Sequence, residues 1–273
     1  MKADNSLTLD NDLFTASLDD DVLIIKQKQI IQHATHDINA VFRFYDDLES
    51  LLANKAYKAL VMFARPEQGE VLEHGRFLCK ALAADRKDKS MERLANMINR
   101  LMLIVSMLNG ITVFAGQGKV SLFHLNLGLA HDYRVVTEDT VFENLNMGVG
   151  MITKGSGYFL PRLLGVRKAA EVLQWKSFSA EEALQLGLVD RIVPAGKLEE
   201  HTMRFVRENL SDSSSTLLGI RKLLKCDIKE LQRSLELEDQ LIKERLESAD
   251  FKQAFGAYCT KTFGCDIEDL RAG

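Results

Sequence analysis

Long apolar runs, paired cysteines and an excess of charge of one sign are all missing from this sequence of 273 residues. No stretch reaches the ~18 to 20 apolar residues that a membrane-spanning helix needs. The polar first residues contain no apolar segment of the kind found in secretory signals. The cysteines form no CxxC pair, which argues against a zinc ribbon and a disulfide framework. We therefore expect a cytoplasmic protein with reduced cysteines and no contact with a membrane.

The charge balance also excludes some classes of partner. The formal net charge is −4, and acidic and basic residues are interspersed. This pattern gives no support for nucleic acid or an acidic membrane surface as the main partner. No arrangement of His, Cys, Asp or Glu has metal-ligand spacing, so we predict no metal. Hydrophobic residues make up 46% of the chain, which is enough for a sizeable core.

The first part of the chain has the pattern of a sheet with covering helices. Two apolar runs at residues 13–18 and 21–26 flank Asp19 and Asp20, which predicts a β-hairpin. Further elements are expected as helices over about residues 36–52, 67–84 and 91–108 and a buried strand over residues 58–63.

The centre of the chain, residues 111–194, has the densest turn, strand and helix signals. A β-branched run at residues 111–115 precedes Gly116, and helical spacing follows at residues 121–130. On a helical wheel Asn126 falls inside the leucine stripe, while Phe123 and His124 point away from it. A buried amide needs a partner. That partner is either a neighbouring backbone group or a ligand, and the sequence leaves both open.

The rest of this central stretch alternates strands and short helices. Strands are predicted at residues 133–137, 140–142 and 188–193. Two short helices should be separated at Gly165. Ser179 and Glu182 form a capping box that begins another helix, which Gly187 ends. After Pro194 helical patterns fill residues 197–262.

The order of these elements and several motifs resemble the crotonase superfamily, also called the enoyl-CoA hydratase/isomerase family. The resemblance rests on Ala130-His-Asp132 with Tyr133-Arg-Val-Val136, Phe142, Gly148-Val-Gly150, Leu160-Pro-Arg-Leu-Leu-Gly165 and, above all, Ser179-Ala-Glu-Glu-Ala-Leu-Gln-Leu-Gly-Leu-Val-Asp-Arg-Ile-Val-Pro194. It covers most of the chain and is weakest between residues 64 and 110.

This resemblance implies an α/β crotonase fold with a ββα spiral core over residues 1–196. It also implies a helical oligomerisation region over residues 197–273, which forms a trimer or a dimer of trimers. The implied substrate is an acyl-CoA, with CoA as part of the substrate and no separate cofactor. Tyr258 and Lys261 are implied to line the CoA pocket of a neighbouring subunit.

The family's chemistry needs two backbone N–H groups that stabilise the oxyanion of an acyl thioester. An alignment from Asp132 backwards places the family's glycine triplet on Leu122, Phe123 and His124, with Phe123 as the donor. Three side chains would crowd this site, and a positive φ would be costly there. The other donor belongs in the loop after Phe63, where Gly69 is the best substitute.

The two glutamates of the hydratases align with Asn126 and Asn146, and neither amide can act as a general base. His124 and Glu143 are the alternative acid–base candidates near the predicted pocket.

Two hypotheses follow from this resemblance and its departures. The favoured one is an enzyme that binds an acyl-CoA and uses an oxyanion hole for isomerisation, ring cleavage or hydrolysis with non-standard residues. The alternative is a non-catalytic homologue that serves as a structural or regulatory subunit.

Overall fold

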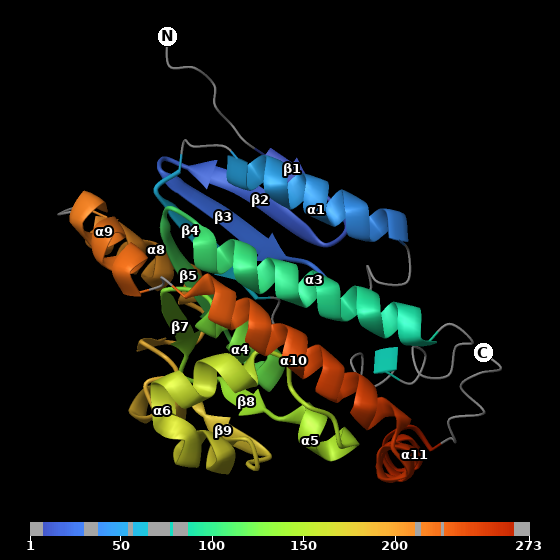
Figure 1. Ribbon diagram of the computed structural model, residues 1–273. Helices are drawn as coiled ribbons and strands as arrows, with labels where there is room; N and C mark the ends of the chain where they lie inside the picture. Colours follow the sequence, from blue (N-terminus) through green and yellow to red (C-terminus); the bar gives the residue numbers. More distant parts are fainter. Residues whose placement is uncertain are drawn as a thin grey trace.

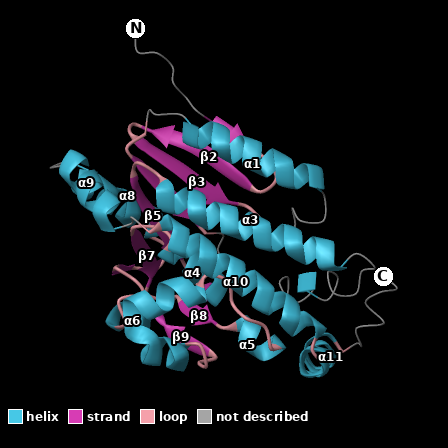
Figure 2. Ribbon diagram, viewed as in Figure 1, coloured by secondary structure: helices cyan, strands magenta, loops and turns pink. Residues whose placement is uncertain are grey.

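The computed structural model describes residues 8–29, 38–53, 57–64, 77–78, 87–210, 214–224 and 227–264. A seven-stranded sheet has the order β1 (Thr8–Asp10), β2 (Phe14–Asp19), β3 (Val22–Gln27), β4 (Ala59–Phe63), β5 (Ile111–Gly116), β7 (Tyr133–Thr137) and β10 (Arg191–Val193). A three-stranded sheet has the order β6 (Lys119–Ser121), β8 (Val141–Glu143) and β9 (Ser177–Ser179). Figure 2 shows both sheets as magenta arrows between the helices.

The helices of the first part are α1 (Ile38–Ala53), α3 (Lys87–Met107), α4 (Leu122–Leu129), α5 (Leu145–Val149), α6 (Ser156–Val172) and α7 (Ala180–Gln185). Those of the last part are α8 (Leu198–Leu210), α9 (Ser214–Leu224), α10 (Ile228–Glu247) and α11 (Ala249–Phe263). Figure 1 shows α1, α3 and α10 as three long helices on the same side of the large sheet. Among the described residues, no helix combines the length and apolar content needed to span a membrane.

The predicted hairpin is confirmed. Strands β2 and β3 pair antiparallel, with Asp19 opposite Val22. Asp20 occupies the turn with a φ of 51°, a left-handed conformation that Asp tolerates better than most residues.

Strands β4, β5 and β7 of the large sheet are buried on both faces. Strands β3, β4, β5, β7 and β10 run parallel to one another, whereas β2 pairs antiparallel with β3. In β4, Leu60 belongs to the larger core and Val61 to a smaller core that includes Phe205 of α8. Alternate side chains of a strand point to opposite faces, so an unbroken apolar run is what such a strand requires.

Helix α4 is buried on every side. Phe123 and His124, which the helical wheel places off the leucine stripe, are buried together with every other residue of the helix. The helix contacts β5, β6, β7, β8 and α6, so it has no solvent-exposed side. A helical wheel identifies the most apolar face of a helix, but it cannot show that the other faces are also covered.

The other central predictions were largely correct. Helix α6 contains a break at Gly165, where φ is 74° and ψ is 156°. The capping box of Ser179 and Glu182 is present at the start of α7. Strands β6 and β9 were missed, because three residues are too few to show a periodic pattern.

The helical character after Pro194 is confirmed by α8 to α11. Helix α10 packs against α3 and α6. Arg221 of α9 forms an ion pair of 2.7 Å with Asp132, which precedes β7. Cys259 is buried in α11. Most of the predicted helix at residues 67–84 and the other three cysteines lie outside the described residues, and the boundary at residues 196–197 stays a prediction.

Candidate functional site

The predicted oxyanion donor lies in the first turn of α4. Ser121 is the N-cap, and its side chain accepts a hydrogen bond from the His124 N–H. Phe123 is the second residue of the helix, so its N–H has no acceptor within the helix. Leu122, Phe123 and His124 are not among the described residues with positive φ. A regular helical turn therefore replaces the glycine turn of the family, and the strain expected here does not arise.

Phe123 and Asn146 line the same cavity, which has a volume of about 50 Å³. Leu94 and Ile98 of α3 form one wall, and Ile242 of α10 forms another. Asn126 does not line this cavity.

Asn126 lies in the interior with no exposed surface. Its Nδ2 donates a hydrogen bond of 2.8 Å to the backbone oxygen of Lys154, while its Oδ1 is buried without a hydrogen-bond partner. The backbone alternative left open by the sequence is thus realised. A carboxylate at this position would face a carbonyl oxygen without a proton to donate.

Asn146 makes an equivalent contact with the same loop. Its Nδ2 donates to the backbone oxygen of Ile152 at 3.3 Å, and its own backbone oxygen accepts from the Met151 N–H at 2.8 Å. The two amides at the family's glutamate positions therefore both hold the loop of residues 151–157. This use requires N–H donors, which glutamate lacks when ionised.

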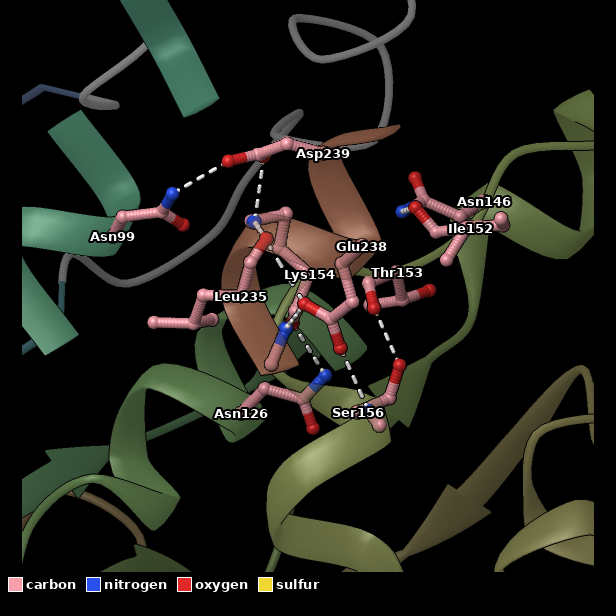
Figure 3. A network of polar contacts seen from close by, with 12 residues as sticks. Asn99, Asn126, Asn146, Ile152, Thr153, Lys154, Ser156, Leu235, Glu238 and Asp239 are labelled. Atoms are coloured by element: carbon pink, nitrogen blue, oxygen red, sulfur yellow. Dashed lines mark hydrogen bonds and ion pairs between the residues drawn. The ribbon is translucent and has the colours of Figure 1, made fainter. Parts of the chain in front are cut away.

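A buried charge network holds the other side of this loop (Figure 3). Oε2 and Oε1 of Glu238 accept hydrogen bonds from the backbone N–H groups of Gly155 and Gly157 at 2.7 and 2.8 Å. The Lys154 ammonium donates to Asp239 at 2.7 Å and to the Leu235 backbone oxygen at 2.8 Å. The same ammonium lies 3.8 Å from Glu238.

The position of Glu238 has electrostatic consequences. Only 5% of the residue is exposed, and burial raises the pKa of its carboxyl above the usual range. The N–H of Gly155, the Lys154 ammonium and the N–H of Gly157 oppose this rise.

Gly155 has a φ of 81°, and a Cβ there would lie 2.8 Å from the Met102 Cε, so glycine is required at this turn.

The roles of Lys154 and Glu238 were not predicted from the sequence. A signal existed for Glu238, because it continues the apolar spacing of Leu231 and Leu235 along the buried face of α10. A carboxylate on such a face should have buried partners. Lys154 lies between turns, where no periodic pattern distinguishes a buried lysine from an exposed one.

His124 faces a different cavity from Phe123. It is 3% exposed and lines a separate space of about 50 Å³ beside Phe44 and Leu48 of α1. Its Nδ1 lies 2.9 Å from the Ser121 Oγ. Consecutive helical residues point about 100° apart, which explains the separation. His124 and Phe123 therefore line different cavities, and the acid–base role of His124 stays a prediction.

Glu143 also lies away from the cavity of Phe123. It is the last residue of β8, where its carboxylate forms an ion pair of 3.1 Å with Lys119. Tyr258 packs partly buried against the core, and Lys261 is exposed near the end of α11. Gly69 lies outside the described residues.

A larger cavity, of about 430 Å³, lies near the C-terminal end of α4. Asp132, Arg162 and Arg221 are among the residues that line it. None of the predicted site residues that the structure describes is among the residues lining this cavity. Within the described part of the chain, no three His, Cys, Asp or Glu side chains converge to hold a metal ion.

Comparison with known proteins gives a consistent picture. Residues 31–263 match the family model described as enoyl-CoA hydratase/isomerase. The trans-2-decenoyl-[acyl-carrier-protein] isomerase of Streptococcus mutans is 26% identical over 183 residues, which cover 66% of this chain and 70% of that protein.

Solved structures support the fold. An enoyl-CoA hydratase from Bacillus halodurans superposes with a TM-score of 0.75 at 19% identity, covering 90% of this chain and 99% of that one. An enoyl-CoA hydratase from Mycobacterium avium gives 0.70 at 18% identity, covering 91% and 96%. The predicted α/β crotonase fold is therefore confirmed. The chain belongs to the enoyl-CoA hydratase/isomerase family.

Proposed function

We propose that this protein binds an acyl thioester in the cavity of Phe123 and Asn146 and polarises its carbonyl with the Phe123 N–H. The observation that carries this proposal is the position of Phe123, which lines the cavity from the first turn of α4. First-turn N–H groups lack helical acceptors and lie at the positive end of the helix dipole. Such a donor stabilises the negative charge that develops on a thioester oxygen.

The lining of the cavity argues against two-carboxylate hydration. Asn126 and Asn146 cannot act as general bases, and Glu143 pairs with Lys119 instead. Among the described residues that line the cavity, Lys154 is the titratable one, and its ammonium donates to Asp239 and Leu235. The supported reactions are those that a polarised carbonyl accelerates, namely isomerisation, ring cleavage or hydrolysis. The Streptococcus mutans relative is an isomerase of an acyl-carrier-protein thioester, so both carriers should be tested.

Two substitutions at position 123 test the proposed hydrogen-bond donor. Phe123→Pro removes the N–H, and the first turn of a helix tolerates proline. Phe123→Ala removes the same ring and keeps the N–H, so the pair isolates the donor. We expect saturable crotonyl-CoA binding to wild type in calorimetric titration. Phe123→Pro should bind about fivefold more weakly than Phe123→Ala, as the loss of a hydrogen bond of about 1 kcal/mol predicts.

The same titration has a clear negative result. Absence of binding to wild type at millimolar crotonyl-CoA and at millimolar acyl-carrier-protein thioester would refute thioester binding. Equal affinities of Phe123→Pro and Phe123→Ala would refute the role of the N–H alone.

A non-catalytic structural or regulatory subunit is the second candidate. It is favoured by the contacts of Asn126 and Asn146, which both bind the loop of residues 151–157. Under this function, wild type shows no turnover of any acyl thioester by mass spectrometry. Turnover that Phe123→Pro reduces would exclude it.

We also propose that the protein forms a trimer or a dimer of trimers through its C-terminal helices. Leu223 and Leu224 of α9 are 77% and 81% exposed, and Leu237 of α10 is 55% exposed. Exposed apolar side chains of this size favour self-association. Light scattering of wild type should give three or six times the mass of one chain, and a monomer would contradict the proposal.

A further inference from the structure

The space beside Phe123 is small for a ligand site. Its volume is about 50 Å³, whereas one water molecule needs about 10 to 15 Å³ on the same measure. Sites for drug-sized ligands measure roughly 300 to 1,000 Å³. The cavity as it stands therefore holds about three groups of the size of a water molecule or a methyl group.

The walls of this cavity suit an apolar group. Leu94, Ile98, Met151 and Ile242 contribute apolar side chains from three different parts of the chain. The Lys154 ammonium is held by Asp239 and Leu235 of α10. A hydrocarbon tail therefore fits these walls better than a polar or charged one.

The ring of Phe123 is fixed at the edge of this space. Phe123 is 7% exposed, and its ring centroid lies 5.1 Å from that of His124. His124 is itself held by the Ser121 Oγ, 2.9 Å from its Nδ1. Movement of the Phe123 ring would break a buried aromatic contact. A bulky ligand therefore cannot displace the ring without a loss of packing.

We propose that Phe123 is a specificity-determining residue that restricts the site to short acyl groups. This inference rests on the proposed function, because it concerns the acyl thioester bound at the same cavity. The accepted substrate class is a thioester whose acyl group has about two to four carbons, since a space of this volume admits about three methyl-sized groups at most beyond the carbonyl. The backbone N–H of Phe123 polarises the carbonyl, and its side chain limits the chain length.

A graded series at this position tests the inference. Crotonyl-CoA and trans-2-decenoyl-CoA are titrated into wild type, Phe123→Leu and Phe123→Ala. Phe205→Leu and Phe205→Ala are matched controls, because Phe205 is also 7% exposed but packs in the smaller core beside Val206. The leucine variants keep the test valid if an alanine variant fails to fold.

Wild type should bind crotonyl-CoA at least tenfold more tightly than the decenoyl thioester. Phe123→Ala should lower this preference at least tenfold, and the preference of Phe123→Leu should lie between those of wild type and Phe123→Ala. The Phe205 variants should keep the wild-type preference. Equal binding of both thioesters by wild type, or equal preferences in the Phe123 and Phe205 series, would overturn the size limit and leave thioester binding intact. Absence of binding by every variant would overturn both proposals.

Discussion

Replacement of Glu238 by glutamine gives the sharpest test of the buried network. The two carboxylate oxygens accept from Gly155 and Gly157 at 2.7 and 2.8 Å. A glutamine side chain has one oxygen, so its NH₂ group would face the second glycine N–H and leave that donor unpaired. An unsatisfied buried donor costs about 1 to 3 kcal/mol. Lys154 keeps its contacts with Asp239 and Leu235, so no buried cation loses all its partners.

We therefore expect Glu238→Gln to lower the free energy of unfolding by about 2 kcal/mol, which corresponds to roughly 4 to 8 °C in Tm. Thermal and urea unfolding followed by circular dichroism measure this. The matched control is Glu236→Gln on the same helix, where the exposed carboxylate accepts from Gln232 and a change below about 0.5 kcal/mol is expected. Equal stability of the two variants would refute the network as described.

The pH dependence gives a second readout of the same variant. Burial raises the pKa of Glu238 in the folded state, so the native protein holds this proton more tightly than the unfolded chain. The resulting stability is fully present below the unfolded pKa of about 4.3 and is lost as the pH rises through the folded value. Glutamine does not titrate. The difference between wild type and Glu238→Gln should therefore be largest near pH 4 and narrow toward neutrality, and a widening difference would contradict the assignment.

Three other substitutions follow from the geometry. Asn126→Asp should lower the free energy of unfolding in urea by about 3 kcal/mol, because a buried carboxylate would face the Lys154 carbonyl oxygen. A loss no larger than that caused by the same substitution at an exposed asparagine would argue against this contact. Arg221→Ala should cost about 2 kcal/mol and speed amide exchange in α9, because it removes the pair with Asp132, whereas the exposed neighbour Lys222→Ala should change neither. Glu143→Gln should change stability by less than about 1 kcal/mol and leave thioester binding unchanged, since its partner Lys119 is 60% exposed; a large loss of binding would place Glu143 in the site after all.

The sequence predicted most elements because their local signals agreed with the fold. The hairpin around Asp20, the break at Gly165 and the capping box at Ser179 depend on neighbouring residues, so periodicity and turn chemistry were sufficient. The motifs from Ala130 to Pro194 were specific enough to predict the family.

By itself, then, the sequence determined the family, the order of most strands and helices, and the absence of glutamate at positions 126 and 146. Tertiary structure decided what the two asparagines do there, since their partners are backbone oxygens of Lys154 and Ile152 in a separate loop. It also decided that His124 faces α1 and that Glu238 comes from α10, more than 80 residues beyond the glycines it contacts. Such contacts depend on how α4, α6 and α10 pack against one another. No local pattern in a single sequence shows which residues far apart in the chain will meet.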